Sequence, residues 1–235
     1  MSGINWEAED AKYIWHPAMQ MKDNEVFPPV VIDHAKGCYL YDTHGKAYLD
    51  IISSWWCNLL GHANPEINAA LKQQVDELEH VIFTNFTHKP AIELARRLSE
   101  LLPAGLTKFT FHDNGSSAVE AALKMAFQYQ YQTGHPERTR FMCLPESYHG
   151  ETIGALSVGS MDLYAKIFHP MLMNNIHFKG LDCYRCPYGK TRETCGVECF
   201  EDAEAAFKKY GKETVACIVE PILQGAAGMR IYPAE

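Results

Sequence analysis

The chain has 235 residues, of which 47% are hydrophobic and 21% charged, a balance typical of a globular protein with a substantial core. Its 21 Lys plus Arg and 29 Asp plus Glu give a net charge of −8 without a basic block, which argues against nucleic-acid binding. No apolar run approaches the ~18 residues of a membrane helix, and the acidic N-terminus lacks the apolar segment of a signal peptide. Eight cysteines without a secretory signal predict reduced thiols and a cytoplasmic protein with no membrane partner.

The N-terminal part of the chain is expected to form a segment of its own, residues 1–60. Proline-containing turns predict irregular structure over residues 1–29. An antiparallel meander packed apart from the main sheet is expected next, because turn residues separate three strand-like runs: 30–34, 38–42 and 47–52. Residues 61–235 are then expected to form the larger domain.

Two adjacent tryptophans, Trp55 and Trp56, end the meander. In an extended backbone they point to opposite faces, so that one fills the core and the other lines a pocket; the alternative is that both are packing residues. Two helices are expected after them. Asn64-Pro65 predicts the start of the first, and Pro90 the start of the second.

The central stretch, residues 107–126, predicts a strand, a tight turn and a helix. Phe109 and Phe111 alternate with polar residues, and the helical pattern begins at Ala118 behind a Ser117–Glu120 capping box. The first N–H groups of such a helix have no internal partner and attract anions, and the turn at Gly115 and Ser116 would let a phosphate come close. An ordinary capped helix that binds nothing is the alternative.

Two later strands also end in polar residues. The strand at residues 139–144 leads into Tyr148-His149-Gly150, and the apolar strand at residues 215–219 ends at Glu220. Open α/β sheets bind ligands at such strand ends, although Tyr148 and His149 are equally consistent with a surface loop. Strands and helices alternate throughout this half, which predicts an α/β fold with a mostly parallel sheet flanked by helices.

A cysteine-rich loop precedes the last of these strands. Four thiolates at this spacing could close a tetrahedral zinc site: Cys183, Cys186, Cys195 and Cys199. The middle gap is shorter than in a zinc ribbon, and no strand pairs surround it. Free or packed thiols are therefore the favoured interpretation.

Four stretches occur in the order found in one enzyme family: residues 53–56, 113–124, 148–152 and 219–229. From about Trp15 onward the chain resembles the class III aminotransferases, pyridoxal-phosphate enzymes of fold type I. Within that family it is most similar to the branch that aminates a keto acid in biotin synthesis. The resemblance implies an aminotransferase that acts on a small keto acid and an amino donor, and a homodimer at full length.

The same resemblance implies roles for single residues. Gly115 and Ser116 would bind the cofactor phosphate, Tyr148 would stack on the pyridine ring and also contact substrate, and His149 would flank the ring. Glu220 would lie near the far side of the cofactor, and Trp55 would line the substrate pocket.

The chain also departs from the family pattern. The lysine that forms the Schiff base with the cofactor, and the aspartate that pairs with the pyridine nitrogen, are not found. We therefore expect an N-terminal part of a longer enzyme that is inactive and poorly soluble alone. Ala18 stands where the biotin branch usually has an aromatic residue. Two alternatives stay open: another class III transaminase for ω-amino acids or diamines, and a non-catalytic product or zinc-binding interaction module.

Overall fold

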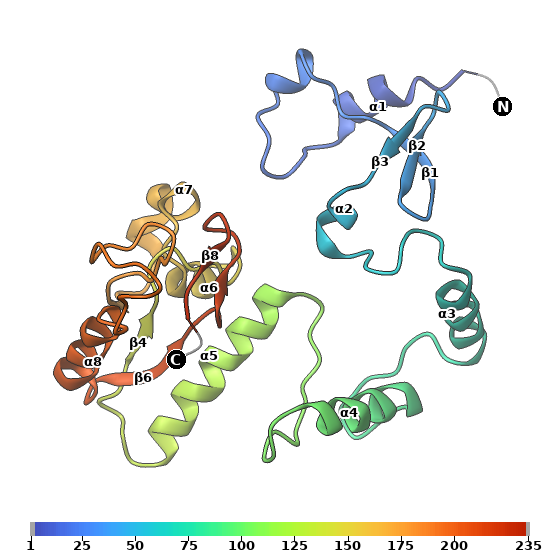
Figure 1. Ribbon diagram of the computed structural model, residues 1–235. Helices are drawn as coiled ribbons and strands as arrows, with labels where there is room; N and C mark the ends of the chain where they lie inside the picture. Colours follow the sequence, from blue (N-terminus) through green and yellow to red (C-terminus); the bar gives the residue numbers. More distant parts are fainter. Residues whose placement is uncertain (1–2, 234–235) are drawn as a thin grey trace. The chain divides into compact units, whose positions relative to one another are not determined.

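The computed structural model describes residues 3–233 and divides into two compact units, Met1–Leu106 and Thr107–Glu235 (Figure 1). The expected domain boundary near residue 60 stays a prediction. Across the described residues, none of the helices combines the length and apolar character needed to cross a bilayer.

The first unit begins with a helix, α1 (Trp6–Tyr13), so the expectation of irregular structure over residues 1–29 is wrong there. Asn5 caps it by accepting a hydrogen bond from the N–H of Ala8 at 3.0 Å. Acidic residues lie in its first turn and Lys12 in its last, which suits the helix dipole. A single 3₁₀ turn (Asp23–Glu25) follows.

The expected antiparallel meander is confirmed. It consists of β1 (Ile32–Lys36), β2 (Tyr39–Asp42) and β3 (Ala47–Leu49), paired in that order. The buried Asp42 closes the second turn, because its carboxylate accepts hydrogen bonds from the N–H groups of His44 and Lys46 and from the Tyr48 hydroxyl, at 2.8–2.9 Å. The turn is therefore held by its own side chains.

The tryptophan pair lies in a left-handed turn, α2 (Ser53–Trp56), so the extended backbone that would point the two rings to opposite faces is not present. All four residues have positive φ, between 47° and 68°, a conformation that costs roughly 1–2 kcal/mol per residue. Asp50 holds the turn: its carboxylate accepts from the N–H and hydroxyl of Ser54 at 2.9 and 2.8 Å, and pairs with His62 at 2.7 Å. Both indoles remain mostly exposed, 66% for Trp55 and 64% for Trp56.

Acid is expected to release this turn. Hydrogen bonds from the Ser54 backbone, His62 and the Ser54 hydroxyl lower the pKa of Asp50 to about 2. Because the folded-state pKa is depressed, the stabilisation is present above the ordinary value near 4 and disappears as the pH falls towards 2. The tryptophan near-ultraviolet circular dichroism should change over that interval, and Asp50→Ala should show the low-pH spectrum at pH 7. Asp33→Ala, at an exposed carboxylate of β1, is the control; an unchanged Asp50→Ala spectrum would contradict the role of Asp50.

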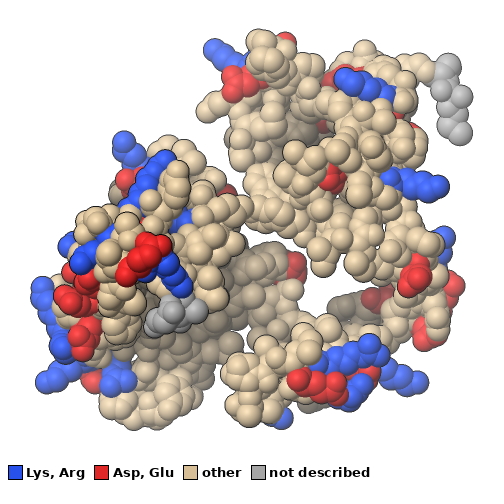
Figure 2. All heavy atoms as spheres, in the orientation of Figure 1, with Lys and Arg blue, Asp and Glu red and all other residues tan. Residues whose placement is uncertain are grey.

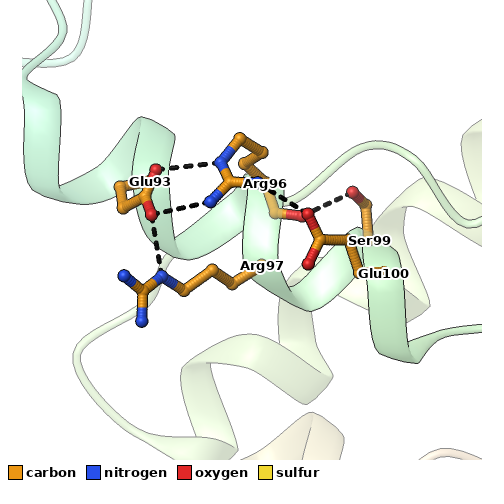
Figure 3. Close-up of polar contacts among 5 residues, drawn as sticks. All are labelled: Glu93, Arg96, Arg97, Ser99 and Glu100. Carbon is orange, nitrogen blue, oxygen red and sulfur yellow. Dashed lines mark hydrogen bonds and ion pairs between the residues drawn. The ribbon is translucent and has the colours of Figure 1, made fainter.

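Two helices complete the first unit. The first, α3 (Pro65–Glu77), has the predicted cap, since the Asn64 side chain accepts from the N–H groups of Glu66 and Ile67. His88 caps the second, α4 (Lys89–Leu101), whose polar face carries mixed charges (Figure 2). There Glu93 binds both Arg96 and Arg97, and these arginines lower the pKa of Glu93 to about 2 (Figure 3). Apolar residues of α3 remain exposed in the described chain, among them Ile67, Leu71 and Val75.

The second unit contains a parallel sheet in the order β5-β4-β6, which confirms the α/β class. Its strands are β4 (Arg140–Cys143), β5 (Ile176–His177) and β6 (Thr214–Ile218), and Met142 of β4 pairs with Ile176 and Cys217. Helix α5 (Gly115–Gln132) packs on one face, where Leu123 joins a core with Phe141, Cys143, Val158 and Val215. Helix α8 (Cys199–Tyr210) faces Leu144 and Cys217 across a cavity of about 260 Å³.

Shorter elements surround this sheet. They are α6 (Ile153–Val158), α7 (Asp162–Ala165), a 3₁₀ turn (Lys166–Met171) and the antiparallel pair β7 (Leu223–Gln224) and β8 (Arg230–Ile231). The strand expected at residues 107–111 is absent from the described chain, so that expectation is wrong. A strand needs a hydrogen-bonded neighbour, and no described strand pairs with this stretch.

Candidate functional site

The helix at the centre of the site, α5, begins at Gly115, earlier than the expected start at Ala118. Asn114 is its cap, and its side chain accepts from the N–H of Ser117 at 2.8 Å. The expected Ser117–Glu120 capping box is therefore wrong. The Ser117 hydroxyl bonds instead to Asp113 and lowers the pKa of that carboxyl, while Glu120 takes donors from α6. Asparagine caps a helix as well as serine does, so residue type does not favour Ser117 over Asn114. The helix begins after Asn114, whose side chain accepts the hydrogen bond from the N–H of Ser117.

The first turn of α5 leaves two donors free. No described residue accepts a hydrogen bond from the N–H groups of Gly115 or Ser116. A Cβ placed on Gly115 would meet nothing within 4 Å, so the corner is open. Free amides at the positive end of a long helix are able to bind an anion, and the phosphate-binding role of Gly115 and Ser116 stays a prediction.

The loop after β4 lies against this corner. The Ser116 hydroxyl oxygen accepts from the N–H of Glu151 at 3.3 Å. Gly150, with φ of +124°, passes so close that an added Cβ would lie 2.2 Å from the same oxygen. Tyr148 is 38% exposed, and its ring meets the edge of Tyr164 at 5.7 Å between centroids. The structure therefore brings Gly115, Ser116 and the Tyr148–Gly150 loop together.

Glu220, just past the end of β6, secures this loop. One carboxylate oxygen accepts from the N–H of Tyr148 at 2.9 Å, and the other from the N–H of Gly225 at 3.0 Å. His149 beside it has a buried Nε2 without a hydrogen-bond partner in the described chain. Burial lowers the pKa of His149, with the Glu220 charge opposing that shift, so the imidazole is mainly neutral at pH 7.

Two polar residues near the loop, Gln224 and Glu120, were not predicted to take part in the site. Gln224 is fully buried and donates to the carbonyl of Pro145 at 2.8 Å, while its Oε1 has no partner in the described chain. A glutamine directly after an apolar pair was the available signal. The other residue is Glu120. Its Ser-x-x-Glu pattern predicted a cap for its own helix, α5, whereas its carboxylate accepts hydrogen bonds from the start of α6.

The remaining predicted residues lie elsewhere. Trp55 belongs to the first unit, and its role in a substrate pocket stays a prediction. The cysteine loop has unbridged thiols, three of which line a small cavity of about 40 Å³: Cys183, Cys186 and Cys195. Burial raises the pKa of Cys183 and of Cys199. Within residues 3–233 no group of three or more His, Cys, Asp or Glu side chains is arranged to hold a metal ion.

Comparison with known families identifies the class. Residues 19–235 match the model of the class III aminotransferases, which is nearly the whole chain. The chain belongs to the class III aminotransferase family. Enzymes of this family depend on pyridoxal phosphate, and one solved structural neighbour is in complex with PMP.

Individual members of this family are similar to the chain over most of its length. Adenosylmethionine-8-amino-7-oxononanoate aminotransferase of Geobacter sulfurreducens is 44% identical over 225 residues, covering 95% of this chain and 50% of the relative. The crystal structure of the Methanocaldococcus jannaschii enzyme of the same name has a TM-score of 0.87 at 38% identity, covering 97% of this chain and 49% of that one. The ω-transaminase of Pseudomonas jessenii in complex with PMP has a TM-score of 0.90 at 27% identity, covering 98% and 51%. The chain spans about half the length of the curated relatives it matches.

Proposed function

We propose that this chain supplies the phosphate- and ring-binding part of a pyridoxal-phosphate-dependent aminotransferase. The observation that carries the proposal is the pair of free amides at Gly115 and Ser116, beside the Ser116 hydroxyl that contacts the loop at Gly150 and Glu151. When bound, pyridoxal phosphate supplies the electron sink for a carbanion next to the transferred amino group. The described residues fit such a group, because they offer open anion donors, a half-exposed aromatic ring and a buried imidazole nitrogen without a partner.

Each residue then has a defined task. Gly115 and Ser116 hold the phosphate through their N–H groups, and Tyr148 presents its ring to the flat face of the cofactor. His149 flanks the ring as a neutral donor or acceptor. Glu220 holds the Tyr148 backbone in place. Trp55 lines the substrate pocket, as the family resemblance implies.

The substrate proposed is 8-amino-7-oxononanoate, which would be aminated in biotin synthesis, because relatives at 39–45% identity carry that name. The complete protein would act as a cytoplasmic homodimer on small molecules. Similarity to ω-transaminases favours a second candidate, a transaminase for ω-amino acids or diamines. Acceptor screening of the complete protein separates them: amination of 8-amino-7-oxononanoate supports the first, and amination of other acceptors alone supports the second.

The phosphate site itself can be tested on this chain with pyridoxamine phosphate, which forms no bond with lysine side chains. We expect it to bind at least about tenfold, or 1.4 kcal/mol, more tightly than pyridoxamine. Gly115→Ala should remove most of this difference, because the new methyl group enters the space of the phosphate without touching the protein. Isothermal titration calorimetry measures both affinities.

The matched control for this test is Gly196→Ala in the cysteine loop, where an added Cβ makes only ordinary contacts. It should leave both affinities unchanged. Equal binding of pyridoxamine and pyridoxamine phosphate by the unsubstituted chain would reject the phosphate site.

A further inference from the structure

Glu120 accepts three hydrogen bonds that the proposed site does not use. It lies on α5, between the free amides at the helix start and the core residue Leu123. Its Oε1 accepts from the Thr152 hydroxyl at 2.6 Å and from the N–H groups of Gly154 and Ala155 at 2.8 and 3.1 Å. One carboxylate oxygen on α5 therefore takes the first donors of α6.

The Glu120 carboxylate packs directly against Gly154 at the start of α6. A Cβ placed on Gly154 would lie 2.2 Å from Oε2 and 2.7 Å from Oε1 of Glu120. Glycine leaves room for the carboxylate this close to the backbone, and the negative charge suits the start of a helix. The separation of α5 and α6 is thus set by Glu120 through direct contact.

This junction lies just beyond the Tyr148–Gly150 loop. Glu220 holds the beginning of the loop through the N–H of Tyr148, and Glu120 holds the residues that follow it. Between these anchors, the loop contacts the phosphate corner through the hydrogen bond from the N–H of Glu151 to the Ser116 hydroxyl, which at 3.3 Å is long and correspondingly weak. The position of the loop relative to the α5 amides therefore depends on Glu120.

We propose that Glu120 is a positioning residue that sets the distance between the phosphate-binding amides of α5 and the ring of Tyr148, so that a phosphorylated pyridine fits both at once. This inference rests on the proposed function. It assigns Glu120 no contact with the cofactor. Its effect is transmitted through Thr152 and the start of α6.

The test compares pyridoxamine phosphate with inorganic phosphate on the chain and on two variants. Inorganic phosphate needs only the amides of Gly115 and Ser116, whereas pyridoxamine phosphate also needs the loop. Glu120→Ala should lower the affinity for pyridoxamine phosphate about tenfold and leave the affinity for inorganic phosphate within about twofold. Glu120→Gln keeps an oxygen acceptor and should restore most of the affinity for pyridoxamine phosphate.

The control is Glu204→Ala on α8, an exposed carboxylate paired with Lys208, which should change neither affinity. Circular dichroism and calorimetry show whether Glu120→Ala is folded. An equal loss of both ligands, or no loss of either, would overturn the positioning role, and the Gln variant decides should the Ala variant not fold. If the unsubstituted chain does not prefer pyridoxamine phosphate to pyridoxamine, the proposed function fails instead.

Discussion

Replacing Gly150 with alanine is expected to abolish binding of pyridoxamine phosphate and to lower the free energy of unfolding of the second unit by about 2–5 kcal/mol. The new Cβ would lie 2.2 Å from the Ser116 hydroxyl oxygen and 2.9 Å from its Cβ, distances that force the loop away from α5. The backbone at φ +124° adds strain for any residue with a side chain. Calorimetric titration and urea unfolding measure the two effects.

Two further variants separate the clash from the strain. Gly105→Ala has a similar φ of +103° and open space around it, so it should cost only the backbone term, about 1–3 kcal/mol, and leave ligand binding intact. Adding Ser116→Gly to Gly150→Ala removes the two nearest clashing atoms and should recover part of the stability. If Gly150→Ala binds pyridoxamine phosphate like the unsubstituted chain, the contact between loop and helix is not needed for the site.

Replacing Met142 with alanine is expected to be the most destabilising change in the sheet, at about 2–5 kcal/mol. Met142 has no exposed surface and lies in the central strand β4, paired on both sides, so the vacated volume cannot be filled by movement of an edge. Urea unfolding of the chain checks the value. The matched control is Met171→Ala, which is 61% exposed and should change stability by less than about 0.5 kcal/mol. Similar midpoints for the two variants would show that β4 is not at the core.

Local signals account for the parts of the fold that the sequence predicts correctly. Asn64-Pro65 begins α3 because an asparagine cap and a proline in the first turn act within a few residues. The meander follows from its turn residues in the same way. The position of Glu220 just past a strand was also predictable, since an apolar run of five residues, 215–219, indicates β6.

Long-range contacts account for the errors. The turn at Trp55 is left-handed because Asp50, itself paired with the more distant His62, captures Ser54, and no pattern within the four residues shows this. The start of α5 illustrates the same limit. A Ser-x-x-Glu pattern suits a capping box, but in the folded chain Glu120 accepts hydrogen bonds from the N–H groups of Gly154 and Ala155 in α6 instead.

The candidate site also has parts that follow from local sequence and parts that depend on long-range contacts. The free amides at Gly115 follow from local sequence, and so does the Tyr148–His149 loop after a strand. The 3.3 Å hydrogen bond between Ser116 and Glu151 depends on how α5 packs on the sheet. The local sequence around neither residue carries that information. The sequence could therefore name the residues of the site and could not show which of them touch.

The left-handed backbone at Ser53–Trp56 has a consequence for any attempt to engineer this family member. Glycine tolerates that handedness at no steric cost, so selection for heat resistance alone should enrich glycine at Ser53, whereas Ser54 also contributes its hydroxyl to Asp50. Variants with glycine in this turn would hold the two indole side chains less firmly. If Trp55 lines the substrate pocket as we propose, selection by melting point alone would loosen that wall of the pocket, so stability and selectivity are best screened together at this position.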